Sequence, residues 1–362
     1  MIFTPINTWF AEEINQPLFI CGPCSAESEE QVLKTAIELQ KEKKINVYRA
    51  GIWKPRTRPG TFEGKGIEAL TWLQEVKRQT NLRVAVEVAS PFHVEACIEK
   101  DVDIIWIGAR TTSNPFSVQE IANSLKGINI PVLIKNPINP DLDFWIGAIE
   151  RIYDAGIRKI AAVHRGFYPF EKTSLRNIPK WEIPIELKTR FNDLPMICDP
   201  SHISGSREFI EEISQKALDL NFDGLMIESH INPEKALSDA SQQLKPDDAI
   251  QLINRLIVRS ISIENEDFAN LLCRFRDQID SIDSQLLQLL SQRMNVVREI
   301  GKYKKYNNVT VFQIRRWQKI IETRMLEGKK IGLSEKFIAQ LLELIHKESI
   351  QEQAEIMKKK EN

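Results

Sequence analysis

Short apolar segments alternate with longer amphipathic segments between residue 18 and about residue 245. The apolar segments are rich in Ile, Val and Ala and do not alternate with polar residues, which is typical of parallel strands buried on both faces. There are eight of them: 18–25, 46–52, 83–90, 104–111, 132–137, 159–166, 196–202 and 224–230. Helix-like stretches separate them, among them 28–43, 64–79, 141–155 and 206–219. Eight such units predict an α/β fold, a (β/α)8 or TIM barrel.

Nearly every apolar segment ends in a residue that can carry charge or bind a metal. These residues are Cys24, Arg49, Glu87, Arg110, Lys135, Arg165, His202 and Glu228. The carboxyl ends of all barrel strands open on one mouth, so we expect these side chains to share a pocket. A doubly wound open sheet is the alternative fold, but the glycine-rich phosphate-binding turn that often follows its first strand is absent.

The pattern becomes helical throughout after about Phe268. Apolar residues there follow alternating steps of three and four, which is typical of a helix-packing seam; they are Leu272, Phe275, Ile279, Ile282, Leu286 and Leu289. A helix sustained to about Lys305 would be roughly 60 Å long. Two further helices, about 312–327 and 334–358, are too short to cover it. The pattern therefore favours a homodimeric bundle or a higher homo-oligomer.

These patterns divide the chain into parts. We expect an N-terminal extension over 1–17, a barrel domain over 18–259, a polar linker over 260–267 and an all-α domain over 268–362. Only about seventeen residues precede the first strand, too few for a separate regulatory domain of ordinary size.

Charge and composition narrow the classes of function. Lys and Arg number 49 against 50 Asp and Glu, so no strong field favours nucleic acid or an anionic membrane. No apolar run is long enough to span a bilayer and the first residues do not form a secretion signal, so we expect a cytoplasmic protein. Five cysteines are an odd number spread over a long chain, which argues against a disulfide framework.

Three interpretations apply to the first strand end, one of which is that Cys21 and Cys24 are a purely structural pair. Cys21 and Cys24 have the spacing of a dithiol redox motif, although such a motif opens a helix in a much smaller domain. Alternatively, Cys24 joins His202, Glu228 and Asp239, the last in the following helix, as ligands of a divalent metal ion. A mixed set of thiolate, imidazole and carboxylates suits Mn²⁺, which we expect first, or Fe, Co or Zn.

Positive residues accompany the candidate metal ligands. They are Arg49, Lys54, Arg56, Arg110, Lys135 and Arg165. So many cations in one pocket would repel one another unless anions neutralise them, so the substrates should carry phosphates and carboxylates. The density of charge favours two phosphates.

The barrel segments resemble a known family. GPCS (22–25), KPRT (54–57), IGAR (107–110), HRG (164–166), DPSH (199–202) and the stretch from Met226 through Asp239 are similar to 3-deoxy-D-arabino-heptulosonate-7-phosphate (DAHP) synthases. The resemblance implies condensation of phosphoenolpyruvate with erythrose 4-phosphate, using a divalent metal held by the four ligands named above. A related synthase that uses arabinose 5-phosphate is an alternative, although KPRT favours the erythrose enzyme.

The same resemblance implies individual roles. Phosphoenolpyruvate would be held by Arg49, Lys54, Arg110, Lys135 and Arg165, and the aldose phosphate by Arg56 and Thr57. Glu87 would lie near the water that attacks the enol-derived carbon. Lys54 and a water on the metal are both candidates to protonate the aldehyde oxygen. We expect His93, His164 and His230 to be structural.

Polar residues interrupt the apolar faces of the helical domain. Arg293 falls on the long seam and Lys304 follows about three turns later, on the same face. Ser349 and Gln353 continue an apolar stripe begun by Ile345. The pattern predicts either an interhelical polar network or a site for a small polyanion.

This domain is similar to the all-helical chorismate mutases, in LLCRFRDQIDSIDSQLLQLLSQR, VREIGKYK and ESIQEQ. The resemblance implies a chorismate site lined by Arg276 of the partner subunit and by Arg293, Lys304, Gln313, Arg316, Ser349 and Gln353. Gln313 and Trp317 depart from the acidic residues that relatives often carry there. An alternative is therefore a sensor that binds chorismate or prephenate and regulates the barrel.

Overall fold

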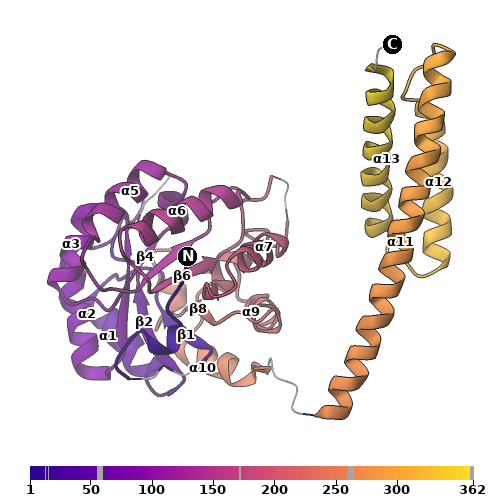
Figure 1. The fold of residues 1–362 in the computed structure, drawn as a ribbon. Coiled ribbons are helices and arrows are strands. Elements are labelled where there is room, and N and C mark those ends of the chain that lie inside the picture. The colour runs from indigo at the N-terminus through magenta and orange to yellow at the C-terminus, as the bar shows by residue number, and fades with distance from the viewer. Residues whose placement is uncertain (13, 15, 55–59, 171–172, 260–264, 359–362) are drawn as a thin grey trace. The chain divides into compact units, whose positions relative to one another are not determined.

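A computed structural model describes all residues except 13, 15, 55–59, 171–172, 260–264 and 359–362. The chain forms two compact units, Met1–Ile261 and Ser262–Asn362. Figure 1 shows strands surrounded by helices in the first unit and helices alone in the second.

The first unit is a closed barrel of parallel strands, in the order in which they follow along the chain, which confirms the predicted fold. The strands are β1 (Leu18–Gly22), β2 (Ile45–Ala50), β3 (Arg83–Val88), β4 (Ile104–Ile107), β5 (Val132–Lys135), β6 (Ile160–His164), β7 (Met196–Cys198) and β8 (Gly224–Glu228). The pairing of β1 with β8, from Leu18 opposite Gly224 to Gly22 opposite Glu228, closes the barrel.

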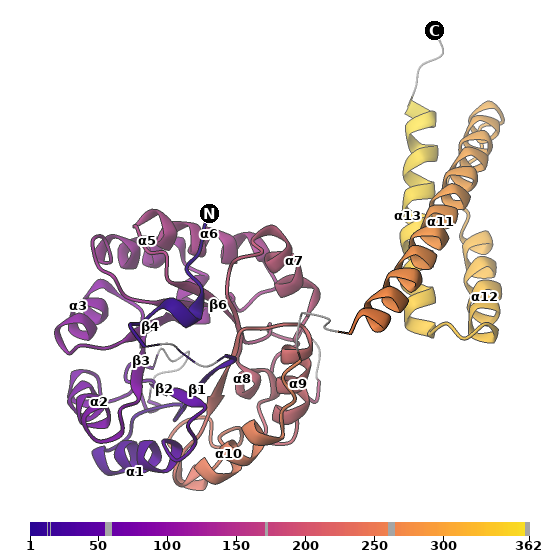
Figure 2. The same cartoon turned by 60° about the horizontal axis from the view of Figure 1, so that its bottom comes forward.

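Helices surround this barrel (Figure 2). They are α1 (Glu29–Leu39), α2 (Ile67–Thr80), α3 (Pro91–Glu99), α4 (Ala109–Thr112), α5 (Pro115–Ser124), α6 (Leu142–Asp154), α7 (Glu182–Arg190), α8 (Pro200–Ser204), α9 (Ile210–Asp219) and α10 (Pro246–Arg255). Side-chain caps fix some starts: Ser28 accepts a hydrogen bond from the Gln31 backbone N–H, and Asp141 caps α6 in the same way. The helices predicted over 28–43 and 141–155 are therefore present with somewhat shorter bounds.

The N-terminal extension is part of the barrel core. It contains a short 3-10 helix, η1 (Ile6–Thr8), and its Ile6, Trp9 and Ile14 are fully buried. These three side chains join the inward-facing residues of the strands, including Leu18 and Ile104 at strand starts. The extension therefore closes the amino end of the barrel interior, a role that the sequence pattern did not indicate.

The alternation of side chains along each strand determines where charged side chains lie in the barrel interior. Side chains two residues apart on a strand point to the same face. The inward-facing Val47, Ala85, Leu133, Ile197 and Met226 belong to the interior apolar cluster. Two residues after each of them comes Arg49, Glu87, Lys135, Asp199 or Glu228. The interior therefore changes from apolar to charged toward the carboxyl ends of the strands.

The second unit contains three helices, α11 (Glu266–Tyr306), α12 (Ile314–Lys330) and α13 (Glu335–Lys358). This agrees with the predicted all-α domain. Gly301 allows close packing of α11 on α13, because a Cβ there would lie 3.0 Å from the Cδ1 atom of Ile356. No helix that the structure describes is long and apolar enough to cross a membrane.

The first half of α11 exposes its apolar seam. More than half of the surface of Phe275, Ile279, Ile282 and Leu286 is accessible in the single chain. The buried residues of α11 are Val297 and Gly301, in its second half. Within the described residues, the seam predicted from Leu272 onward therefore has no covering helix of the same chain.

Candidate active sites

The carboxyl ends of the strands surround a small polar cavity of about 100 Å³. Its lining consists of Arg49, Lys54, Glu87, Gly108, Ala109, Arg110, Lys135, Arg165, Arg176, His202 and Asp239. Most of the residues predicted at strand ends thus lie in one pocket. Arg110 lies on the short helix α4 and His202 on the short helix α8, each just after its strand. Arg56 and Thr57 lie outside the described residues.

Three of the four predicted metal ligands lie together. Ligand atoms of Cys24, Glu228 and Asp239 are all within 4.8 Å of one another, and Cys24 Sγ is 3.2 Å from Asp239 Oδ2. His202 lies outside this group of three, with its Nε2 atom 3.8 Å from Glu228 Oε1. Asp239 was predicted in a helix, which is wrong: it lies in the loop before α10 with a φ of 48°.

These residues fit a divalent metal ion. Glu228 is completely buried, and its Oε1 atom has no hydrogen-bond partner among the described residues, although Arg49 Nη2 lies 3.3 Å from it. A buried carboxylate oxygen is costly unless hydrogen bonds or a cation satisfy it. One thiol, one imidazole and two carboxylates would together hold Mn, Fe, Co or Zn rather than Mg or Ca.

The protonation states agree with this fit. Burial, reinforced by Glu228, raises the pKa of Cys24 to about 12, so a thiolate there requires a compensating positive charge. Burial lowers the pKa of His202, which favours the neutral imidazole that metals bind. Burial alone would raise the pKa of Asp239, but His202, Arg176 and Lys54 outweigh it and lower that pKa.

Two cations of the pocket, Arg49 and Lys135, are almost completely buried. Arg49 is 1% exposed, lies 3.3 Å from Glu228 and stacks over the Trp106 ring at 4.9 Å. Its Nε and Nη1 atoms have no hydrogen-bond partner among the described residues. Burial, reinforced by the nearby Arg176 and Arg110, lowers the pKa of Arg165 to about 10. An anionic ligand would relieve both the repulsion and the unsatisfied donors.

Lys54 contacts a candidate metal ligand, and Glu87 lines the same cavity. Lys54 Nζ donates to the Cys24 carbonyl and to Cys24 Sγ, both at 3.1 Å. Burial lowers the pKa of Lys54, but Cys24 and the carboxylates of Glu87 and Glu228 outweigh this and raise it. Glu87 requires the glycine at position 108, since a Cβ there would lie 2.1 Å from Glu87 Oε1.

Three residues in the pocket or in contact with its residues were not singled out from the sequence: Asp199, Arg176 and Gln242. Asp199 is fully buried and bridges Lys135 Nζ at 2.6 Å and His202 Nδ1 at 2.8 Å. Strand alternation could have indicated Asp199, because it follows the inward-facing Ile197 by two residues. Arg176 and Gln242 come from loops, where no periodic signal exists.

The geometry argues against a dithiol centre. Cys21 packs in the apolar layer between strands and helices, whereas Cys24 reaches the polar cavity. Burial raises the pKa of Cys21 as well as that of Cys24. A reactive dithiol needs an accessible thiol of lowered pKa.

The predicted residues of the helical unit form a smaller cluster. Arg293 Nη1 donates to Ser349 Oγ at 2.6 Å and so joins α11 to α13. Gln353 is 8% exposed, and its Oε1 atom has no hydrogen-bond partner among the described residues. Lys304 Nζ donates to the Val311 carbonyl at 2.6 Å. Burial lowers the pKa of both Arg293 and Lys304.

Other predicted residues of the helical unit lie at the edge of this cluster or away from it. Trp317 stacks on the His346 ring with centroids 3.8 Å apart, and Gln313 is the residue before α12. Arg316 is exposed. Arg276 precedes Arg293 on the same helix by about 25 Å at 1.5 Å per residue. Arg276 of the same chain therefore cannot reach the cluster.

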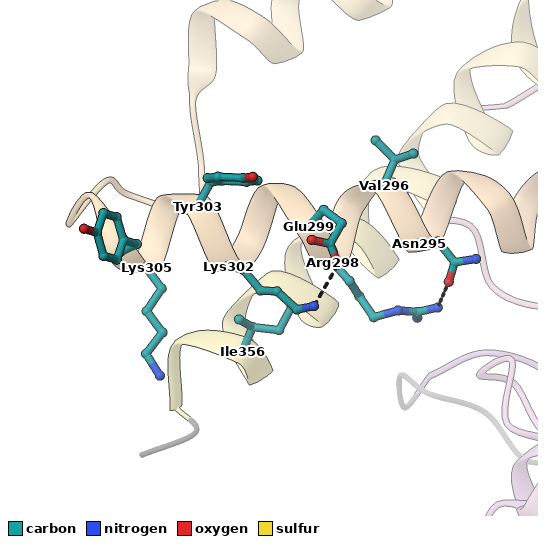
Figure 3. Close-up of a pocket in the computed structure, with 9 residues that line it drawn as sticks. Asn295, Val296, Arg298, Glu299, Lys302, Tyr303, Lys305 and Ile356 are labelled. Carbon is teal, nitrogen blue, oxygen red and sulfur yellow. Dashed lines mark hydrogen bonds and ion pairs between the residues drawn. The ribbon is translucent and has the colours of Figure 1, made fainter. Parts of the chain in front are cut away.

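An open groove of about 990 Å³ runs along the second half of α11 and reaches Ile356 of α13 (Figure 3). Asn295, Val296, Arg298, Glu299, Lys302, Tyr303, Lys305, Tyr306 and Ile356 line it. Glu299 and Lys302 form an ion pair, and Arg298 donates to Asn295. In the described helices, the predicted site residues lie elsewhere, so this groove is not the predicted site.

Comparison with known proteins gives two families. The DAHP synthetase I family matches residues 10–259, and chorismate mutase type II matches residues 275–354. A phospho-2-dehydro-3-deoxyheptonate aldolase of Thermotoga maritima is 35% identical over 62% of this chain. The match spans 64% of that relative, which is less than two thirds of its length.

Two further comparisons agree. A crystal structure of the aldolase (DAHP synthase) from Thermotoga maritima has a TM-score of 0.58 and 32% identity, over 66% of this chain and 67% of that one. A 2-dehydro-3-deoxyphosphooctonate aldolase of Desulfotalea psychrophila is 29% identical over 69% of this chain and 92% of its own length. The chain therefore belongs to the DAHP synthetase I family and carries a chorismate mutase type II domain at its C-terminal end.

Proposed function

We propose that the barrel condenses phosphoenolpyruvate with erythrose 4-phosphate to give DAHP and phosphate. One observation carries the proposal: metal-ligand side chains and a group of cations, of which Arg49 and Lys135 are buried, share one small cavity. The cations suit the carboxylate and phosphates of the two substrates. The thiol, imidazole and carboxylate cluster suits a divalent metal.

Each group has a chemical task in this reaction. Attack of the enol carbon on the aldehyde places negative charge on the aldehyde oxygen, and a bound divalent metal would supply Lewis-acid stabilisation. Lys54, whose pKa is raised, would give a proton to that oxygen. Glu87 would orient the water that attacks the enol-derived carbon. Arg49, Lys135 and Arg165 would hold phosphoenolpyruvate while its phosphate leaves.

A different aldose is the second candidate for this site. The similarity to a 2-dehydro-3-deoxyphosphooctonate aldolase favours arabinose 5-phosphate as the substrate to compare. The KPRT segment, in which Arg56 and Thr57 would hold the aldose phosphate, favours erythrose 4-phosphate.

Consumption of phosphoenolpyruvate tests both candidates. We expect turnover with erythrose 4-phosphate that disappears after EDTA treatment and returns with Mn²⁺. Turnover with arabinose 5-phosphate alone would overturn the proposed substrate. Turnover that survives complete removal of metal would overturn the proposed metal site.

We also propose that the helical unit converts chorismate to prephenate as a homodimer. Chorismate carries two carboxylates, and its rearrangement needs a compact conformer and a stabilised ether oxygen rather than acid–base chemistry. Arg293 and Lys304 provide positive charge, and Gln353 and Ser349 provide hydrogen bonds, beside the exposed seam. A second copy on the seam would bring Arg276 of the partner subunit to this cluster.

Trp317 favours a second candidate for the helical unit. Its ring stacks on His346 and offers no acceptor for a substrate hydroxyl. The unit would then act mainly as a sensor of chorismate or prephenate that regulates the barrel. Prephenate formation by the full chain distinguishes the two: turnover supports the mutase, whereas binding without turnover supports the sensor.

A further inference from the structure

Two side chains outside the predicted ligand set contact its carboxylates. Gln242, in the loop before α10, is fully buried and donates from Nε2 to Glu228 Oε2 at 2.6 Å. Arg176, in the loop before α7, donates from Nη1 to Asp239 Oδ1 at 2.9 Å and to Gln242 Oε1 at 2.7 Å. These contacts join Glu228, Gln242, Arg176 and Asp239 in one continuous chain of hydrogen bonds, which we name the Arg176–Gln242 brace.

The brace uses one oxygen of each carboxylate and leaves the other directed at the remaining ligands. Glu228 Oε2 and Asp239 Oδ1 are the braced oxygens. The other oxygen of Glu228, Oε1, faces His202 Nε2 at 3.8 Å. The other oxygen of Asp239, Oδ2, faces Cys24 Sγ at 3.2 Å. The rotation of each carboxylate is therefore fixed with the oxygen outside the brace toward the cluster, where Glu228 Oε1 also lies 3.3 Å from Arg49 Nη2.

We infer that Arg176 and Gln242 are positioning residues that hold Glu228 and Asp239 in the orientation a divalent metal ion requires. The inference rests on the proposed metal site. Side chains that orient metal ligands typically change metal affinity by ~10–100-fold when removed. The neighbouring Gln243 anchors the third ligand: its Oε1 atom accepts from the Cys24 backbone N–H at 2.9 Å, and its Nε2 atom donates to the Ser238 carbonyl at 2.8 Å.

The test uses Mn²⁺ alone as the probe, with the full chain. Arg176→Met removes one half of the brace and Gln242→Leu removes the other. We expect each variant to bind Mn²⁺ ~10–100-fold more weakly in calorimetric titrations, with little change in the melting temperature of the metal-free protein. With Co²⁺ as a spectroscopic probe, we expect altered ligand-field bands. Arg176→Lys should restore part of the affinity, because lysine can still donate to Asp239.

Arg207 provides a matched control. It holds the same loop through the backbone carbonyls of Gln243 and Ala240, and its side chain is 38% exposed against 44% for Arg176. Arg207→Met should leave Mn²⁺ affinity unchanged. An equal loss in Arg207→Met would overturn the inference, because the effect would then come from the loop as a whole.

The remaining outcomes distinguish a failure of the Arg176–Gln242 brace from a failure of the proposed metal site. Wild-type affinity in both Arg176→Met and Gln242→Leu would overturn the brace and leave the metal site intact. Absence of Mn²⁺ binding by the unaltered protein would overturn the metal site and the brace with it. If Gln242→Leu does not fold, Arg176→Met decides the question, because Arg176 is partly exposed and its loss leaves no cavity in the core.

Discussion

The barrel pocket and the helical cluster differ in how much of each site one chain supplies. In the barrel, Glu228 and Asp199 are completely buried and both lie within ion-pair distance of cations of the same chain. In the helical unit, Arg293 and Lys304 are only partly buried and Arg276 is out of reach. The first site is organised by closure of a barrel. The second, in our proposal, is completed by a second copy.

This difference follows from how each fold buries charge. A closed barrel brings strand ends from all parts of the chain to one mouth, so charges compensate one another within the unit. Three helices cover only part of one another, and the apolar seam of α11 stays exposed. The two sites should therefore respond differently to the same kind of change.

The largest expected effect is in the barrel. Cys24→Ala removes a thiolate ligand, and we expect phosphoenolpyruvate consumption to fall by ~10³-fold because charge stabilisation at the aldehyde oxygen is lost. Prephenate formation by the same variant should be unchanged. Cys21→Ala is the matched control and should keep most of the barrel activity; equal losses in both variants would instead support the dithiol interpretation.

The next effect is in the helical unit. Lys304→Met removes the cation proposed to stabilise the ether oxygen, so we expect prephenate formation to fall by ~10²-fold with the barrel reaction intact. Lys302→Met, two residues earlier on the exposed side of α11, serves as the control and should be nearly silent. Similar activities for both variants and the unaltered chain would contradict the proposed role of Lys304.

A smaller effect, which depends on protein concentration, is expected from a substitution that disrupts the proposed dimer. Ile282→Glu places a charge on the exposed seam, and we expect the full chain to dissociate in analytical ultracentrifugation. At low micromolar concentration mutase activity should fall ~10-fold, because Arg276 of the partner subunit is lost. Ser284→Glu changes the opposite face of the same helical turn. It should neither dissociate the dimer nor lower mutase activity. A dimer unaffected by Ile282→Glu would place the interface elsewhere.

The smallest effect is the response of the two units to acid. Burial lowers the pKa of His164 from 6.5 to about 3, so the unfolded chain binds a proton that the folded barrel does not. His164 therefore contributes stability that is present above about pH 6.5 and decreases as the pH falls toward 3. Between pH 7 and pH 5 the loss should be about 2 kcal/mol of unfolding free energy.

Denaturant unfolding followed by tryptophan fluorescence measures this loss, because every tryptophan except Trp317 lies in the barrel unit. In His164→Asn this part of the pH dependence should disappear. His346 of the helical unit also has a pKa lowered by burial, but it is partly exposed, so His346→Asn should change the acid response little. An unchanged pH slope in His164→Asn would refute the assignment.

Much of the fold could be predicted from the sequence because the patterns that indicate strands and helices are local. Apolar segments without alternation indicated buried parallel strands, and seven-residue spacing indicated the long helix α11. The short helices α4 and α8 were not predicted, since four or five residues are too few to show a period. The role of the N-terminal extension was missed because Ile6, Trp9 and Ile14 meet their partners only after the barrel closes.

Less of the candidate site could be predicted from the sequence. Residues near strand ends, such as Arg49 and Lys135, were found because they lie toward the ends of apolar segments of the sequence. Asp239 was placed in a helix because its neighbours suggested one, whereas its positive φ belongs to a loop. His202 was expected beside the other ligands, and the structure connects it through Glu228.

The sequence by itself determined the strands, the longer helices and the charged residues at the ends of apolar segments, because backbone periodicity acts over a few residues. Only the tertiary structure decided how those residues are oriented. Arg176 lies 63 positions from Asp239, and Gln242 lies 66 positions from Arg176. No local pattern relates residues so far apart. Their contact, and with it the direction of each carboxylate oxygen, arises only when β6 and β8 close into the same barrel.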